Sequence, residues 1–231
     1  MEHVYSSLTQ RANNIYRELI TEGSRQRRIL IAFAGPPGSG KSTIAAHVVE
    51  QINMTAQRAI AASLPMDGFH YTRAQLDTLP NSVKAHAQRG ASWTFDANGV
   101  VGLIKILSAS RHDADPVTVL APSFDHSIKD PVADSIRIGP EIQIIIIEGN
   151  WLLLDREPWM QIPKYVDDTW FVDVDVSLAR RRIAARHIVS GIESTWEDAL
   201  SRADTNDLPN GDEVRGHLVS PNIRVMSVEG R

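Results

Sequence analysis

The chain has 231 residues, of which 42% are hydrophobic, and its formal net charge is −4. This size can bury one α/β core, and the negative charge is unlike that of a protein that binds nucleic acid or an anionic membrane. The absence of cysteine excludes disulfides, thiolate catalysis and cysteine-ligated metal sites. No apolar run reaches the roughly 20 residues of a membrane span, and the N-terminus lacks the pattern of a signal peptide. We therefore expect a soluble, cytoplasmic protein, and the composition leaves a homodimer open.

The first predicted elements surround a glycine-rich loop. Apolar spacing predicts a helix over Val4–Thr21, and the basic residues up to Arg28 are interpreted as a solvated connector. An apolar strand at Ile29–Ala34 leads into Gly-Pro-Pro-Gly-Ser-Gly-Lys-Ser, which matches the phosphate-loop pattern G-x-x-x-x-G-K-[ST]. A helical pattern at Thr43–Val49 follows. This strand–loop–helix context predicts a site for a nucleoside triphosphate.

Each part of this loop suits the binding of phosphate. Glycines let successive N–H groups point at phosphate oxygens, and the helix N-terminus adds its positive end. We expect Lys41 to reach the β- and γ-phosphates and the Ser42 hydroxyl to bind Mg²⁺. The residues predicted to contact ATP are Gly35, Pro36, Pro37, Gly38, Ser39, Gly40, Lys41, Ser42 and Thr43.

The rest of the chain alternates between predicted strands and helices, which is typical of a mostly parallel sheet with right-handed crossovers. Apolar runs predict strands at Ala59–Met66, Val117–Ala121, Ile142–Ile147, Trp170–Val174 and Ile223–Val228. Helical patterns cover Gly99–Ser108, Leu178–Val189 and Trp196–Ala203, and Asp113–Pro116 is interpreted as a surface turn. Because no linker or repeat interrupts this order, we expect one domain over residues 1–231.

Two of the predicted strands end in a carboxylate, at the edge where open α/β sheets bind their ligands. Glu148 follows four isoleucines, which favours a Mg²⁺-binding role over the capping of a neighbouring helix. Asp67 ends the first strand after the phosphate loop, where a carboxylate can accept the proton of an attacking hydroxyl and help to position Mg²⁺. The alternative for Asp67 is an ordinary Asp-Gly turn. His70, just beyond Asp67, is a candidate for the acceptor pocket.

Other classes of phosphate-loop protein fit less well. The Asn-Lys-x-Asp sequence of GTPases and the Leu-Ser-Gly-Gly-Gln signature of transporter ATPases do not occur. The remaining prediction is a small-molecule kinase that uses ATP and Mg²⁺. A nucleoside monophosphate kinase and a non-catalytic ATP-sensing module are the alternatives.

With these motifs in order, the sequence resembles the phosphoribulokinase/uridine kinase superfamily of phosphate-loop kinases, including the bacterial-type pantothenate kinase branch. The matching stretches are the phosphate loop, Met66–His70, Ile147–Gly149 and the arginine-rich Ala179–Arg186. The resemblance implies a three-layer α/β sandwich whose central, mostly parallel sheet has about five strands. It also implies a helical lid at about 178–205 and transfer of the γ-phosphate of ATP to a hydroxyl of a nucleoside, sugar or vitamin-like metabolite.

The resemblance assigns roles to individual residues. Asp67 matches the family's catalytic acid, and Glu148 matches the strand-end acid near Mg²⁺. Phe124 and His126, within Ala121–His126, fall on a stretch that touches the acceptor. Arg89 falls on a segment similar to the Lys-Arg-Gly stretch of pantothenate kinases, and we expect it to bind the substrate.

The arginine-rich segment supplies a pair of candidate catalytic residues. Arg182 and Arg186 are spaced i,i+4, so they share one face of the predicted helix. Within the family context, this face could close over the triphosphate and stabilise the charge that develops on its oxygens. The alternative is a solvated basic face.

The sequence departs from the uridine kinases at one point. Their His-Pro-Asp-Ala-Phe-Asp stretch is absent, and Gln88–Asp96 stands in its place. The nearer likeness is to a less characterised subgroup of nucleoside or sugar kinases, whose Asn-Asp-x-Pro-Asn element resembles Thr205–Gly211. That element could contact the acceptor or form a surface turn.

Overall fold

A parallel sheet lies at the centre of the computed structural model, which describes residues 1–21, 28–112, 117–125 and 127–229. Its strands follow the order β2-β5-β1-β6-β7, and all four neighbouring pairs are parallel. They are β1 (Ile29–Ala34), β2 (Ala61–Pro65), β5 (Ile144–Gly149), β6 (Asp168–Val174) and β7 (Ile223–Ser227). The predicted α/β class with a five-stranded parallel sheet is confirmed.

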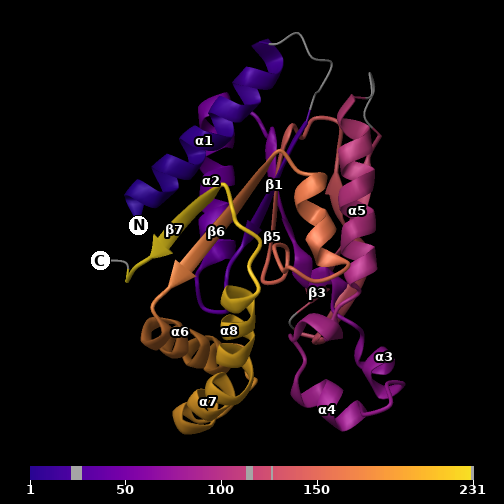
Figure 1. Ribbon diagram of the computed structural model, residues 1–231, viewed down its shortest axis with the longest axis vertical. Coiled ribbons are helices and arrows are strands. Elements are labelled where there is room, and N and C mark those ends of the chain that lie inside the picture. Colours follow the sequence, from indigo (N-terminus) through magenta and orange to yellow (C-terminus); the bar gives the residue numbers. More distant parts are fainter. Residues whose placement is uncertain (22–27, 113–116, 126, 230–231) are drawn as a thin grey trace.

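Helices cover both faces of this sheet (Figure 1). The α-helices are α1 (Glu2–Thr21), α2 (Lys41–Ala56), α3 (Arg73–Asp77), α4 (Ser82–Ala87), α5 (Ala97–Ala109), α6 (Val176–Val189), α7 (Trp196–Arg202) and α8 (Leu208–Gly216). Short 3₁₀ turns are η1 (Met66–Phe69), η2 (Ser92–Thr94), η3 (Ser110–His112) and η4 (Trp159–Lys164), and η5 (Ala203–Asp207) is a π-helix. No helix of the described residues is long and apolar enough to cross a membrane.

The central strands are apolar throughout because both of their faces are covered. Every residue of β1 and of β5 is buried. One hydrophobic cluster packs α1 and α2 against the sheet, and a second packs α5 and the segment around Trp151 and Trp159 against the opposite face. Burial on both faces explains why four consecutive isoleucines are tolerated in β5.

The strand predicted at Val117–Ala121 does not join the central sheet. Instead β3 (Val119–Asp125) pairs antiparallel with β4 (Asp130–Ile138) in a separate two-stranded sheet. No strand was predicted at β4, whose side chains are largely exposed and therefore lack an apolar run. The predicted turn at Asp113–Pro116 lies outside the described residues.

The prediction of a solvated connector is wrong for Arg28. Its side chain is buried, and its guanidinium donates hydrogen bonds to the carbonyls of Ile142 (3.0 Å) and Gly139 (2.6 Å) and to the Ser110 hydroxyl (3.1 Å). A buried guanidinium is tolerated because these oxygens replace the water it loses. The rest of that basic run lies outside the described residues.

Candidate active site

The phosphate loop connects β1 to α2, as predicted. Gly38 and Gly40 have φ angles of 76° and 80°, a region that only glycine enters without strain. A Cβ atom on Gly38 would also lie 2.8 Å from the carbonyl oxygen of Ala179. Gly40 caps α2, so the N–H groups of Lys41 and Ser42 have no partner within the helix and lie at its positive end. This geometry suits the binding of a polyphosphate.

Lys41 and Glu148 lie together where β1 and β5 end. Burial lowers the pKa of Lys41, while the charges of Glu148 and Asp67 oppose this effect. Burial also raises the pKa of Glu148, which Lys41 and a hydrogen bond with the Ser42 side chain oppose. The side chains predicted to act on phosphate and metal therefore form one interacting cluster.

Asp67 belongs to the same cluster because of the strand register. Pro65 at the end of β2 pairs with Glu148 of β5, and Asp67 follows in the turn η1. The Asp67 carbonyl accepts a hydrogen bond from the His70 ring at Nδ1 (2.8 Å), which holds that ring beside the turn. Asp67 is thus part of a 3₁₀ turn at the sheet edge, with its side chain among the cavity-lining residues.

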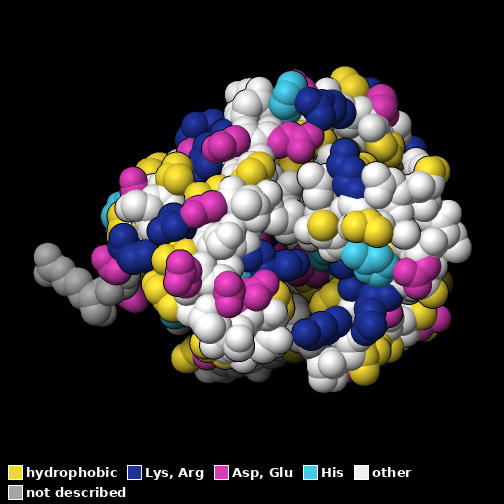
Figure 2. All heavy atoms as spheres, turned by 90° about the horizontal axis from the view of Figure 1, so that it is seen from below, with side chains coloured by type: hydrophobic (Ala, Val, Ile, Leu, Met, Phe, Trp, Pro, Cys, Tyr) yellow, Lys and Arg dark blue, Asp and Glu magenta, His cyan; other side chains and the backbone are white. Residues whose placement is uncertain are grey.

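A cavity of about 920 Å³ opens beside this cluster. Seen from the end of the molecule that carries α4 and α7, the surface is hollowed, and Lys and Arg side chains gather in and around the hollow (Figure 2). The volume is near the upper limit for small-molecule sites, so it has room for a nucleotide together with a second ligand.

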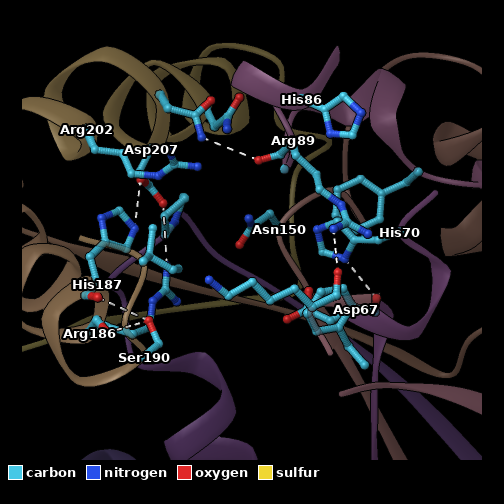
Figure 3. Close-up of a pocket in the computed structure, with 18 of the residues that line it drawn as sticks. Asp67, His70, His86, Arg89, Asn150, Arg186, His187, Ser190, Arg202 and Asp207 are labelled. Atoms are coloured by element: carbon cyan, nitrogen blue, oxygen red, sulfur yellow. Dashed lines mark hydrogen bonds and ion pairs between the residues drawn. The ribbon is translucent and has the colours of Figure 1, made fainter. Parts of the chain in front are cut away.

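Two walls face each other across the cavity (Figure 3). The α3–β3 wall consists of Asp67, His70, Arg73, His86, Arg89, Phe124 and Lys129, and the α6–α7 wall of Arg186, His187, Ser190, Arg202, Asn206 and Asp207. Asn206 donates a hydrogen bond to the Arg89 carbonyl (3.4 Å), and Lys129 donates one to the Gly191 carbonyl (3.5 Å). These contacts join segments that are far apart in the sequence.

Three of the four predicted substrate-binding residues lie on the α3–β3 wall. The centroid of the His70 ring is 5.0 Å from that of the Phe124 ring, and the Arg89 guanidinium lies over Phe124 at 5.4 Å. Arg89 also donates to the carbonyls of Tyr71 and Lys129 and forms an ion pair with Asp130 (2.7 Å). The fourth residue, His126, lies outside the described residues.

The predicted arginine pair is divided between two places. Arg186 lines the cavity, and its guanidinium is 3.5 Å from the Asp207 carboxylate. Arg182 does not line it; this side chain donates to the Gly38 carbonyl (3.3 Å) and to the Ser227 hydroxyl (2.8 Å). Arg182 therefore lies beside the phosphate loop and is hydrogen-bonded to the end of β7, so the two guanidinium groups lie in different places, and their catalytic roles stay a prediction.

Sequence reasoning gave no role to two buried groups of the cavity. The side-chain oxygen of Asn150, just past β5, is buried without a partner among the described residues. His187 Nε2 lies 3.4 Å from an oxygen of Asp207. Burial lowers the pKa of His187 and raises that of Asp207. Asn150 could have been noticed as the residue after Glu148-Gly149, whereas nothing in the sequence pairs His187 with Asp207.

The Asn-Asp-x-Pro-Asn element is not a surface turn. It forms the end of η5 and the start of α8, with Asp207 and Asn210 buried and Asn206 at the cavity. The fold therefore excludes the surface turn, and contact of this element with the acceptor stays a prediction.

The candidate cation site lies at the phosphate loop and offers oxygen donors from Ser42 and Glu148. Within the described residues, no group of three or more His, Asp or Glu side chains is arranged to hold a metal by itself. Mg²⁺ in nucleotide sites takes one or two protein oxygens and completes its shell with phosphate and water. The Ser42 hydroxyl and the buried Glu148 carboxylate are such oxygens, so the residues present fit a Mg²⁺-nucleotide site.

Comparisons with known proteins agree with this geometry. The model of the Phosphoribulokinase / Uridine kinase family matches residues 30–190. "Putative uridine kinase C227.14" of Schizosaccharomyces pombe is 42% identical over 211 residues, which cover 91% of this chain and 88% of that protein. "ATP-dependent kinase YFH7" of Saccharomyces cerevisiae (strain YJM789) is 31% identical over 245 residues, which cover 93% of this chain and 66% of that protein.

A solved structure shows the same fold. The crystal structure of YFH7 from Saccharomyces cerevisiae superposes with a TM-score of 0.85 at 23% identity, over 95% of this chain and 99% of that chain. The family match covers the phosphate loop, both strand-end acids and all of α6. The chain therefore belongs to the phosphoribulokinase/uridine kinase family and is an ATP-dependent kinase.

Proposed function

We propose that this kinase transfers the γ-phosphate of ATP to a hydroxyl of a small metabolite, with Asp67 as the general base. The hydroxyl proton passes to the Asp67 carboxylate, and the hydroxyl oxygen forms a bond to the γ-phosphorus. The bond from that phosphorus to the β–γ bridging oxygen breaks, and ADP leaves. Lys41 and Arg186 stabilise the charge that spreads over the phosphoryl oxygens.

One observation carries this proposal. Asp67 interacts electrostatically with both Lys41 and Glu148, and the same carboxylate lines the cavity from which an acceptor would approach. A protein that only binds ATP needs the lysine and a metal-binding oxygen, but it has no use for a carboxylate at the acceptor side. The position of Asp67 therefore favours catalysis over ATP sensing.

The nucleotide would occupy the phosphate loop with Mg²⁺. Ser42 and Glu148 would hold this cation, with Asp67 close enough to help position it. When bound, Mg²⁺ neutralises charge on the β- and γ-phosphates and orients them for in-line attack. The loop N–H groups and Lys41 bind the same phosphates, so the protein supplies position and charge.

The acceptor is a nucleoside, a sugar or a vitamin-like alcohol. The name of the Schizosaccharomyces pombe relative favours a nucleoside. The His-Pro-Asp-Ala-Phe-Asp stretch of uridine kinases is absent, so sugars and vitamin-like alcohols stay candidate acceptors. A nucleoside monophosphate kinase is the second candidate, and the cationic residues of the α3–β3 wall favour it, because its acceptor carries a phosphate.

The test is ADP release from Mg²⁺ and ATP across a panel of nucleosides, nucleoside monophosphates, sugars and hydroxylated vitamins. We expect release that depends on an acceptor with a free hydroxyl, and a product that carries a phosphate monoester at that hydroxyl. Lys41→Ala is the control, because it should lose ATP affinity and turnover together. A phosphoanhydride product would support the monophosphate kinase, and tight ATP binding without any acceptor-dependent turnover would support the sensing module.

A further inference from the structure

Three cationic residues of the α3–β3 wall, Arg73, Arg89 and Lys129, line the cavity around one short segment, Lys129–Asp130. The Arg89 guanidinium donates to the Lys129 carbonyl (2.6 Å) and pairs with Asp130 (2.7 Å). The backbone N–H of Arg73 donates to the same Asp130 carboxylate (2.9 Å), and Lys129 precedes Asp130 in the chain. We call Arg73, Arg89 and Lys129 the basic cluster.

The positive charge of the basic cluster exceeds the negative charge that faces it. Asp130 neutralises Arg89, and in the described part of the chain neither Arg73 nor Lys129 has a carboxylate partner. Two other basic residues of the cavity lie beside carboxylates: a ring nitrogen of His86 is 2.7 Å from Asp77, and the Arg202 guanidinium is 3.6 Å from Glu193. About two positive charges therefore remain for a ligand to neutralise.

The basic cluster is distinct from the groups that would hold ATP. Lys41 begins α2 and Arg186 lies on α6, whereas Arg73, Arg89 and Lys129 come from α3, the α4–η2 connection and the β3–β4 turn. The His70 ring is hydrogen-bonded to the Asp67 carbonyl and contacts the Phe124 ring, over which the Arg89 guanidinium lies. A ligand with its hydroxyl at Asp67 would run along these rings before it reached the cluster.

The cluster is also built into the wall. The Arg89 side chain is only 14% exposed, and its Nε atom is buried without a hydrogen-bond acceptor in the described part of the chain. Both terminal nitrogens of its guanidinium are fixed by carbonyl oxygens of the wall, so its orientation is set before a ligand binds. Such a preorganised guanidinium suits a carboxylate or a phosphate, together with two cations that have no carboxylate partner among the described residues.

We propose that the acceptor is an anionic hydroxylated metabolite, whose carboxylate or phosphate binds the basic cluster while its hydroxyl lies at Asp67. This inference rests on the proposed function and narrows it. A neutral nucleoside or sugar would leave the charges of Arg73 and Lys129 uncompensated next to the bound ligand. The rings of His70 and Phe124 would pack against the body of the acceptor.

The experiment divides a deproteinised cell extract into the fraction that an anion exchanger retains at neutral pH and the fraction that it does not. Each fraction is incubated with the full chain, Mg²⁺ and γ-labelled ATP, and label transfer to small molecules is measured against the Lys41→Ala variant. Ribose 5-phosphate with ribose, and gluconate with glucose, serve as defined pairs that differ in the anionic group. We expect label transfer with the retained fraction and not with the other.

Variants then locate the anionic group. Arg73→Gln and Lys129→Gln should each raise the concentration of acceptor needed for half-maximal rate about 10–100-fold, since each removes a charged partner of the ligand. Both residues are exposed and can be changed without opening the core. Lys84→Gln is the matched control, because Lys84 is exposed on α4 but does not line the cavity.

The outcomes separate this inference from the proposed function. Transfer only with the unretained fraction, or equal kinetics in the Arg73, Lys129 and Lys84 variants, would overturn the anionic acceptor and leave the kinase proposal intact. No acceptor-dependent transfer with either fraction would reject the proposed function, and the inference with it.

Discussion

Arg182 and Arg186 are one helical turn apart in α6, yet their guanidinium groups lie in different surroundings. Arg182 donates to the Ser227 hydroxyl (2.8 Å) and to the Gly38 carbonyl, whereas Arg186 approaches Asp207 (3.5 Å) at the edge of the cavity. The Arg186 side chain remains 59% exposed, so it is free to reach a bound phosphate. The two arginines should therefore respond differently to substitution.

Arg186→Ala is expected to depress kcat strongly and leave stability nearly unchanged. Charge stabilisation by an arginine in phosphoryl transfer contributes roughly 10³–10⁵ in rate at its strongest, while exposed substitutions usually change stability by about 0.5 kcal/mol or less. Steady-state kinetics and urea unfolding measure the two quantities. Arg181→Ala is the control, because Arg181 lies on the same helix, pairs with Glu229 at 3.5 Å and is not among the residues that line the cavity. A wild-type kcat in the Arg186 variant would remove this residue from the reaction.

A network around Asp168 is expected to govern stability in acid. Asp168 is buried and accepts hydrogen bonds from Arg11 (2.5 and 2.9 Å), Trp170 (2.6 Å) and Asn222 (2.7 Å). Burial alone would raise the pKa of Asp168, but the bonds from Arg11, Asn222 and Trp170 hold it below its ordinary value. Breaking such a buried pair costs about 3–5 kcal/mol, and we expect Asp168→Asn to lose stability on this scale at pH 7.

The sign of the pH effect follows from the lowered pKa. The stability that Asp168 contributes is present above its unfolded-state pKa of about 3.9 and is lost as the pH falls through the folded value. The difference between wild type and Asp168→Asn in urea unfolding should therefore shrink as the pH is lowered below about 4. Asp134→Asn, an exposed change on β4, should show no such trend. A difference that stays constant with pH would contradict the network.

His187 is expected to make the folded state less stable as the pH falls below about 6.5, the ordinary pKa of histidine. Burial lowers the pKa of His187, Arg186 and Arg202 act in the same direction, and Asp207 opposes them. The unfolded chain therefore gains a proton at a higher pH than the folded chain does, and stability is lost from about pH 6.5 down to the folded pKa. His187→Gln should lose less stability than wild type between pH 7 and pH 5 in urea unfolding. His3→Gln, an exposed change in α1, should follow the wild-type profile.

The phosphate loop and the two strand-end acids were predictable because their signals are local. The loop pattern fixes the turn between β1 and α2, and an apolar run that ends in an acid places Asp67 and Glu148 at one edge of a parallel sheet. The strand register that brings Pro65 opposite Glu148 confirms that common edge. Their chemical roles stay predictions.

What the sequence missed depends on contacts between distant segments. Arg28 looked like a solvated cation, because its partners Gly139 and Ile142 are more than a hundred residues away. β4 has no apolar pattern, since it forms an exposed hairpin, and so the turn that carries Lys129 into the cavity could not be foreseen. The i,i+4 spacing predicted that Arg182 and Arg186 share one face of α6. The Arg182 guanidinium is instead hydrogen-bonded to Ser227 at the end of β7, apart from that of Arg186.

Asp67→Asn tests the central claim most directly, because it keeps the shape of the side chain and removes its capacity to accept a proton. ATP affinity should be close to wild type by calorimetry, with modest weakening if the carboxylate also positions Mg²⁺. With the acceptor identified by the panel or the extract fractions, kcat should fall by about 10²–10⁴, the usual contribution of a positioned general base, and the loss should appear in kcat rather than only in KM. A near-normal kcat in Asp67→Asn would contradict the account, and Glu148 would replace Asp67 as the candidate base.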